Sequence, residues 1–290
     1  MNYRGYATSI FGSVADKYES SFQAVKDSLP KADIKIAYRT YISVAFLTSI
    51  IVYIAALVAT IIITQILLKP SIIMLTFYVI FIPVITAAMS FLLFNYYPHS
   101  RVSTRRKSIE VNLPFVLTHM GAVAESGVPP QVIFKLMAQF KEYGEISNEM
   151  EKIVRNIEMF GVDPLTSVKG VAEKTPSDSL RQLLYGFVTT TESGGNIKTY
   201  LKNAGIQALF EWRMKREKFL QQLSAYAEFY TGLLIAAPLF MVAIFAVMNM
   251  IQPTLGGYTI LDLMKFSVYA LIPLMNGGFL IFLHGVEVEM

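Results

Sequence analysis

The 290-residue sequence contains no cysteine. Neither a disulfide framework nor a thiolate metal site can form without it. Histidine is also scarce, and His99, His119 and His284 lie far apart with no metal-ligand spacing. We therefore predict no metal site. His119, inside an expected bundle helix, is predicted to be a structurally satisfied residue.

Signatures of catalysis are missing as well. The sequence has no Gly-x-x-x-x-Gly-Lys-Ser/Thr loop to cradle phosphates, so the chain is not itself a Walker-type ATPase. It has no Gly-x-Ser-x-Gly nucleophile elbow and no acid pair in its apolar segments. We predict a protein that is not an enzyme, with no catalytic residues and no cofactor.

Charge is sparse, at 16% of residues, whereas soluble proteins carry ~25%. The missing charges define four apolar windows, and about 20 apolar residues suffice to cross a ~30 Å hydrocarbon core. This pattern predicts an all-α polytopic membrane protein with about four transmembrane helices. The expected spans are 42–68, 72–97, 229–251 and 266–284.

The windows divide the chain into four predicted regions. These are an N-terminal amphipathic arm (1–41), a transmembrane hairpin (42–97) broken at Lys69-Pro70-Ser71, a helical bundle (98–227) and a C-terminal transmembrane pair (228–290). In the arm, apolar residues from Ile10 to Val25 recur at helical spacing until Pro30. Such a helix either packs on the protein or the membrane surface, or docks a soluble partner.

Basic residues predict the topology. Of the 25 Lys and Arg residues, all but Lys69 and Lys265 lie in 1–41 or 98–227. Positive residues concentrate on the cytoplasmic side, so both termini and the bundle are expected in the cytoplasm and the spans in the cytoplasmic membrane. No aromatic interleaving or motif indicates nucleic-acid binding. Two basic clusters next to spans are expected at lipid headgroups: Arg101, Arg105, Arg106 and Lys107, and Arg213, Lys215, Arg216 and Lys218.

Glycine, proline and capping residues divide 112–223 into about six helices joined by short loops. Asn112 is expected to cap the first helix with Pro114 in its first turn, Ser147 to precede the third, Asp163-Pro164 to start the fourth and Asn196 to open the sixth. The sixth has no clear stop before the third span, so we expect one long helix to return the chain to the membrane.

The phrase Glu-Ser-Gly occurs twice in the bundle, at 125–127 and 192–194. Each glycine is placed to end a helix in a left-handed conformation. The repeat predicts two equivalent helix hairpins, although a match this short also arises by chance. Glu125 and Glu192 fall in a last helical turn, where the dipole disfavours negative charge. A helix start, a basic group or a cation compensates them, or else they are solvated.

Prolines lie within three spans, at Pro83, Pro238 and Pro273. They are predicted to act as hinges or packing kinks, which membrane helices tolerate when neighbouring groups satisfy the backbone. Broken helices also occur in transporters. A small transporter or channel with a regulatory bundle is therefore the alternative function, although these spans hold almost no ionisable residue.

Several phrases together resemble the F domain of type II secretion systems. They are Asn-Leu-Pro-Phe-Val-Leu-Thr at 112–118, Glu-Ser-Gly-Val-Pro at 125–129, Glu-Ser-Gly-Gly-Asn-Ile at 192–197, Pro238, and Ile-Pro-Leu-Met-Asn at 272–276. The likeness covers roughly 100–285. The predicted topology of this chain is similar to that of the platform proteins of archaella, archaeal type IV pili and tight-adherence pili.

This resemblance implies a membrane platform that couples a separate hexameric assembly ATPase to pilin-like subunits. The turns around Glu125, Gly127, Glu192 and Gly194 are then expected to dock the ATPase, and either basic cluster is an alternative contact for an acidic ATPase surface. Many members of the family carry two F domains. The single domain here implies a homodimer or a paralogous partner.

Overall fold

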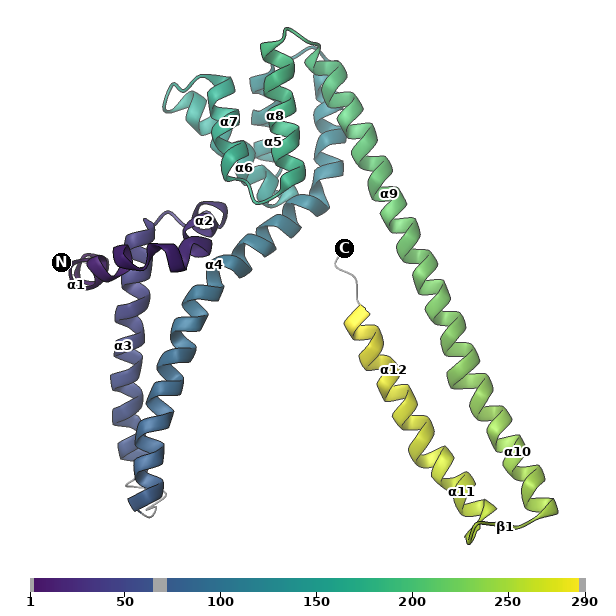
Figure 1. Cartoon of the computed structure of the whole chain (residues 1–290). Coiled ribbons are helices and arrows are strands. Elements are labelled where there is room, and N and C mark those ends of the chain that lie inside the picture. Colours follow the sequence, from purple (N-terminus) through teal and green to yellow (C-terminus); the bar gives the residue numbers. More distant parts are fainter. Residues whose placement is uncertain (1–2, 65–71, 287–290) are drawn as a thin grey trace. The chain divides into compact units, whose positions relative to one another are not determined.

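The structure, a computed structural model, describes residues 3–64 and 72–286. Helices make up nearly all of this part (Figure 1). Four of them are long and apolar enough to cross a membrane: Tyr38–Ile63, Thr76–Glu125, Ile197–Ile251 and Ile260–Gly285. The predicted all-α, four-span class is confirmed. The expected break at Lys69-Pro70-Ser71 lies outside the described residues.

The chain forms two compact units, residues 1–206 and 207–290. The first contains the arm, the first two spans and most of the bundle. The second contains the rest of the long helix that begins at Ile197 and the last two spans. The predicted region boundaries at 97/98 and 227/228 stay predictions.

The arm consists of two helices instead of the single one expected. Helix α1 (Tyr3–Lys17) is followed by the short turn η1 (Glu19–Phe22) and by α2 (Gln23–Lys31), so the apolar face is interrupted at Tyr18. Pro30 lies inside α2, one residue before the helix ends at Lys31, close to the predicted break. Val25 and Leu29 of α2 form one apolar cluster with Tyr41 and Ile42 of α3 (Tyr38–Ile63). The arm therefore packs on the membrane hairpin.

Helix α4 (Ile72–Glu125) continues from the second span into the bundle. The expected helix start at Asn112 is wrong. The Asn112 side-chain amide donates to the carbonyl of Ser108, one turn back, instead of capping a new helix. Pro98 and Pro114 lie inside α4, which bends along its length (Figure 1). Proline removes a backbone donor and kinks a helix without necessarily ending it.

Four shorter helices complete the bundle with the end of α4 and the start of α9: α5 (Pro130–Gln139), α6 (Glu145–Glu158), α7 (Pro164–Lys174) and α8 (Asp178–Glu192). A short turn, η3 (Lys141–Tyr143), separates α5 from α6. The Asp163 cap is confirmed, because its carboxylate accepts from the Thr166 amide at 3.0 Å. Helix α6 begins before Ser147, whose hydroxyl donates to the Ala138 carbonyl.

Long aliphatic side chains form the bundle core. Those with almost no exposure include Ile109, Met120, Ile133, Met137, Ile146, Met150, Ile153, Leu180, Leu184 and Leu201. Burying apolar surface is the main favourable term in folding. The bundle can therefore hold its shape outside the lipid, unlike the spans.

In the second unit, α9 (Ile197–Tyr230) passes through a π-helical segment, η4 (Thr231–Ala236), into α10 (Ala237–Ile251). A two-stranded hairpin, β1 (Thr254–Leu255) and β2 (Tyr258–Thr259), leads to α11 (Ile260–Phe266), the π-helical η5 (Ser267–Leu271) and α12 (Ile272–Val286).

Both π-helical segments end just before a proline, at Pro238 and Pro273. Proline has no amide hydrogen, so the carbonyl one turn before it needs another donor, and a wider turn supplies one. This local geometry fits the predicted hinges, which stay a prediction.

Candidate functional site

The two Glu-Ser-Gly turns have the same backbone geometry. Gly127 and Gly194 have φ angles of 78° and 69°, in the left-handed region that favours glycine. The amides of both glycines donate to the carbonyl three residues back, each at 3.1 Å. The serine hydroxyls, on Ser126 and Ser193, also donate to a carbonyl three residues back. The repeat thus marks two equivalent helix ends.

The turns lie at the same end of the bundle. The Lys198 ammonium, just after the second turn, donates to the backbone carbonyl of Glu125 at 2.7 Å. One helical turn further, Lys202 pairs with the Glu125 carboxylate at 2.6 Å. The start of α9 is therefore placed directly against the end of α4.

Basic groups compensate both carboxylates. Glu125 pairs with Lys202, and Glu192 pairs with Lys169 of α7 at 2.7 Å. The hydrogen bond to Glu192 raises the pKa of Lys169 above its usual value. All four side chains are about half exposed. Of the alternatives that the sequence left open, the structure shows basic partners from the same chain.

Two glycines that the sequence patterns did not single out fix the helix crossing. A Cβ on Gly205 of α9 would lie 2.9 Å from the Leu117 carbonyl oxygen of α4, and one on Gly121 would lie 3.2 Å from Lys202 Cα. Without side chains, the two backbones approach closely. Helical spacing cannot show that these glycines face each other, because they lie on helices far apart in the sequence.

The first basic cluster divides between two environments. Arg106 and Lys107 are exposed, as headgroup contact would require, and Arg101 is exposed while its Nε donates to the Ala32 carbonyl. Arg105 does not fit that expectation, because it is 3% exposed. Its Nε pairs with Glu145 at 2.7 Å, its Nη2 with the buried Glu149, and its Nη1 donates to the Lys31 carbonyl.

These contacts define what we call the arm clamp: Arg105, Glu145, Glu149, Lys152 and Asp33. Lys152 contacts both Glu149 and Asp33 at 3.1 Å. Asp33 has a left-handed φ of 57° in the turn after α2. Burying charges is tolerated when they are paired and hydrogen-bonded. The clamp therefore fastens the turn that precedes the first span to the bundle.

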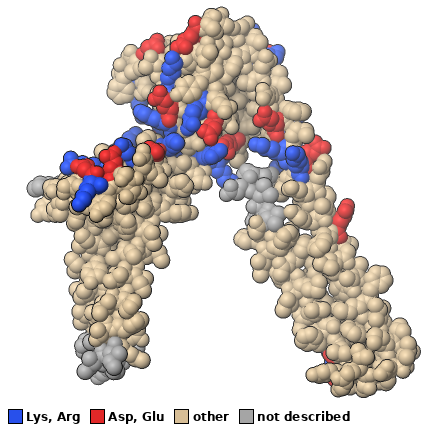
Figure 2. Space-filling view, viewed as in Figure 1, with Lys and Arg blue, Asp and Glu red and all other residues tan. Residues whose placement is uncertain are grey.

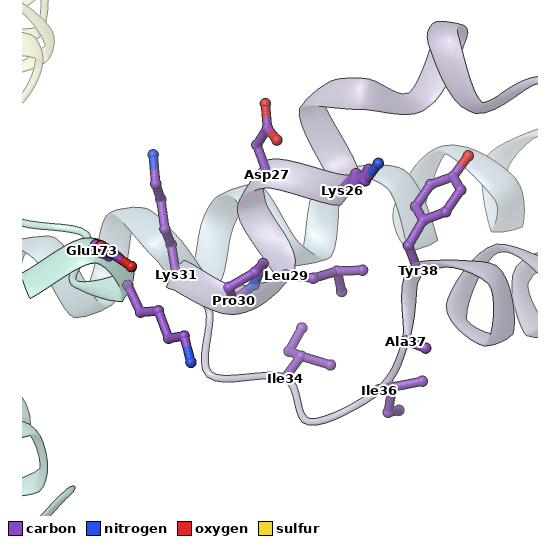
Figure 3. A pocket seen from close by; sticks show the side chains of 11 residues that line it. Lys26, Asp27, Leu29, Pro30, Lys31, Ile34, Ile36, Ala37, Tyr38 and Glu173 are labelled. Atoms are coloured by element: carbon purple, nitrogen blue, oxygen red, sulfur yellow. The ribbon is translucent and has the colours of Figure 1, made fainter. Parts of the chain in front are cut away.

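A groove of about 600 Å³ lies beside this clamp. It is bordered by α2, by the loop that leads into α3 and by the end of α7 (Figure 3). Leu29, Ile34 and Ile36 give it an apolar lining, while Lys26 and Glu173 add charge. Sequence reasoning missed this groove, since it exists only where the arm meets α7.

Charge is distributed unevenly within each unit (Figure 2). In the first unit, Lys, Arg, Asp and Glu gather over the bundle and the arm, while the hairpin of α3 and α4 shows almost none on this face. In the second, Arg213, Lys215, Arg216 and Lys218 are all exposed on α9. Arg216 lies over the Trp212 ring at 5.9 Å, a cation–π contact.

The polar groups in the described spans are few and form structural contacts. Tyr230 donates to the side-chain oxygen of Asn276 at 3.4 Å, which links two helices of the second unit. His119, in the bundle part of α4, bonds the Tyr143 hydroxyl at 2.9 Å and packs against Phe140. Within the described residues, no group of three or more His, Asp or Glu is arranged to hold a metal ion.

A helical bundle between pairs of apolar spans defines a polytopic α-helical membrane protein. Residues 116–245, from the last turns of α4 into α10, match the family of the type II secretion system (T2SS) protein F. The bundle and most of the third span are therefore similar to this family, and the predicted resemblance is confirmed. The match does not include the Ile-Pro-Leu-Met-Asn phrase at 272–276.

Three archaeal proteins are similar to about two thirds of this chain. An uncharacterized protein of Methanocaldococcus jannaschii is 24% identical over 193 residues, or 66% of this chain and 32% of that protein. Flagella accessory protein J of the same organism is 20% identical over 60% of this chain and 30% of its own length. Its namesake from Methanococcus voltae is 20% identical with the same coverage. The chain thus spans about a third of the length of these relatives. No solved structure matches it.

Proposed function

We propose that this chain is the membrane platform of a type IV pilus-like or archaellum-like machine. In this role it catalyses no reaction, and it couples a separate assembly ATPase to pilin-like subunits in the membrane. The observation that carries the proposal is the match of residues 116–245 to the T2SS protein F family, which extends from the bundle into the third span. The similarity to two flagella accessory J proteins supports it.

The ATPase docks, in this proposal, on the end of the bundle that holds the two Glu-Ser-Gly turns. That end presents two half-exposed carboxylates, Glu125 and Glu192. Their lysine partners are exposed too, and exposed ion pairs are worth only ~0–1 kcal/mol. An incoming partner can therefore exchange these contacts at little cost.

The close crossing of α9 and α4 at Gly205 then transmits a displacement that the ATPase applies at the turns. A displacement applied at the turns acts on the start of α9, which is held against α4 at Gly121 and Gly205. Helix α9 leads without interruption into the third span. We propose that this helix carries the displacement toward the pilin-like subunits, and that the prolines after the π-helical segments absorb part of it.

A deletion strain tests the platform role. We expect loss of the surface filament while the pilin-like subunits still accumulate in the membrane, with rescue by the intact gene. A deletion strain with normal filaments would refute the proposal. Flux of solute through the purified chain in proteoliposomes would instead favour the transporter or channel alternative.

A charge swap tests the docking end. Glu125→Lys reverses the carboxylate and breaks its pair, and Glu125→Lys with Lys202→Glu restores a pair with the charges exchanged. If Glu125 contacts the ATPase, both the single and the double variant fail to co-purify the ATPase. If the carboxylate only stabilises the turn, the double variant restores co-purification of the ATPase.

The matched control is Glu151→Lys. Glu151 forms an equally exposed pair with Lys141 at 2.6 Å, but near the other end of α5, away from the turns. We expect normal ATPase binding for this variant. Equal loss in the control would mean that overall charge, and not the turns, governs binding.

The orientation and assembly of the chain are part of the same proposal. The bundle and both termini lie in the cytoplasm, and a second copy or a paralogue completes the platform. Because the sequence has no cysteine, the single variant Met159→Cys, at an exposed position of the bundle, shows directly on which side of the membrane the bundle lies. Labelling of intact cells by a membrane-impermeant thiol reagent would contradict a cytoplasmic bundle.

A further inference from the structure

Helix α1 has three distinct faces. Small residues, Ala7, Gly12 and Ala15, are buried against the rest of the first unit. Tyr3, Tyr6 and Ile10 form an exposed stripe at spacings of three and four, each about half exposed. Ser9, Ser13 and Asp16 form a second exposed stripe, which is polar. Between Tyr3 and Asp16, the exposed surface of the helix therefore has an apolar stripe beside a polar stripe.

The small face brings α1 close to α3. A Cβ on Gly12 would lie 2.8 Å from Nε of Arg39, whose guanidinium also pairs with Asp16 at 3.3 Å. Phe11 stacks on Phe46 of α3 with ring centroids 6.1 Å apart. Helix α1 thus lies against the beginning of the first span, crossing it rather than running along it (Figure 1).

The contacts with α3 also give the depth of the apolar stripe. Arg39 is the last charged residue before the charge-free run of the first span. The Tyr3 hydroxyl bonds the Thr48 hydroxyl at 2.9 Å, and Thr48 lies about 14 Å further along α3 at 1.5 Å per residue. The side chain of Tyr3 therefore reaches the level of the charge-free run of α3.

We propose that α1 is an interfacial membrane helix, whose Tyr3, Tyr6 and Ile10 stripe inserts into the lipid leaflet next to the bundle. The occupant of this surface is lipid, because the stripe adjoins a membrane span and its Tyr3 hydroxyl bonds Thr48 within that span. Tyrosine favours the boundary between headgroups and acyl chains, and two of the three residues of the stripe are tyrosines. The polar stripe then faces the headgroups and water.

This proposal is independent of the platform function. It assigns the arm to the membrane surface and leaves the bundle end free for protein partners. The arm clamp adds a consequence, because Asp33 and the carbonyl of Lys31 tie the arm to the bundle. An inserted α1 would set the height of the bundle above the lipid.

Site-directed spin labelling tests the insertion in the full chain, which has no native cysteine. Single variants Tyr6→Cys and Ile10→Cys carry a nitroxide after reconstitution into phosphatidylcholine/phosphatidylglycerol vesicles. Accessibility is measured toward oxygen, which concentrates in the bilayer, and toward a water-soluble nickel complex. Ser9→Cys is the matched control, since Ser9 is the neighbour of Ile10 on the polar stripe.

Two further positions give reference values. Ile54→Cys is exposed on α3 within the first span, and Met159→Cys is exposed on the bundle. We expect positions 6 and 10 to match Ile54→Cys, with high oxygen and low nickel accessibility. Ser9→Cys should be severalfold more accessible to nickel than Ile10→Cys.

Two results would overturn the proposal. Nickel accessibility at positions 6 and 10 equal to that at Met159→Cys would mean that the stripe faces water. Low accessibility to both reagents would mean that protein covers the stripe, either a second copy or another membrane protein. Because spin mobility reports local folding, a variant that loses the helix is recognised by a mobile spectrum of its own label, in contrast to the ordered spectrum expected of the Ser9→Cys control.

Discussion

Ion pairs at two places on α4 share the same chemistry but have different surroundings. At Arg105 and Glu149 the side chains are only 4% and 2% exposed. At Glu125 and Lys202, about 30 Å further along the helix, they are 46% and 55% exposed. Desolvation makes a buried charge costly to leave unpaired, whereas water screens an exposed one. The buried pair thus fixes how the arm and α6 pack against α4, and the exposed pair is available to exchange partners.

The largest effect is expected from the buried member. Arg105→Ala leaves Glu149 buried with only Lys152 as a cation and frees the Lys31 carbonyl. Removing one partner of a buried pair costs ~3–5 kcal/mol. We expect a lower unfolding midpoint in detergent and faster hydrogen exchange in α2 and α6. Arg106→Ala, on the exposed side of the same turn, is the control and should cost ~1 kcal/mol or less. Equal effects would remove the distinction between the two environments.

An intermediate effect is expected where α9 crosses α4 beside the exposed pair. Gly205→Leu places a side chain against the Leu117 backbone, and overpacking of this kind costs ~1–3 kcal/mol. Gly170→Ala in α7 meets no atom within 4 Å, so it should be neutral or stabilising, since Ala is the better helix former. Thermal unfolding of both variants checks this. A Gly205→Leu protein as stable as the parent would mean that the crossing is not held closely.

The smallest effect concerns the exposed pair at the second turn. The pKa of Lys169 is raised by its hydrogen bond to Glu192, so the pair contributes stability below the usual lysine pKa and loses it as pH rises through the raised value. We expect a small loss of stability above about pH 10 that is absent in Lys169→Gln. Parallel unfolding curves from pH 8 to 11 measure it. A loss of the same size in Lys169→Gln would assign it to other groups.

Local sequence signals predicted much of the fold. Four uncharged runs gave the spans, because lipid requires long apolar helices. Asp163 and Asn196 gave correct helix starts, since their side chains bond an amide three residues ahead. Gly127 and Gly194 gave correct ends. The pattern Asn112-x-Pro114 gave a wrong helix start. A proline that is tolerated inside a helix cannot be distinguished by sequence from a proline in a first turn.

The candidate site was only partly predictable. The repeated phrase identified both turns, but not that Lys198 and Lys202 bring them together or that lysines already neutralise both carboxylates. Arg105 was counted with its basic neighbours on the assumption of headgroup contact. Its burial depends on Glu145 and Glu149, which lie some forty residues away and become neighbours only after folding.

The sequence by itself determined the class of this protein. Its long apolar runs can satisfy their backbone in lipid only as membrane helices, and the charged, capped segment between them forms a helical bundle. Tertiary structure decided the rest. Which glycines let α9 approach α4, which arginine is buried, and which face of α1 meets lipid all depend on contacts between segments distant in the chain. Local periodicity contains no information about such pairs, because it reports the environment along one helix and not the partner across from it.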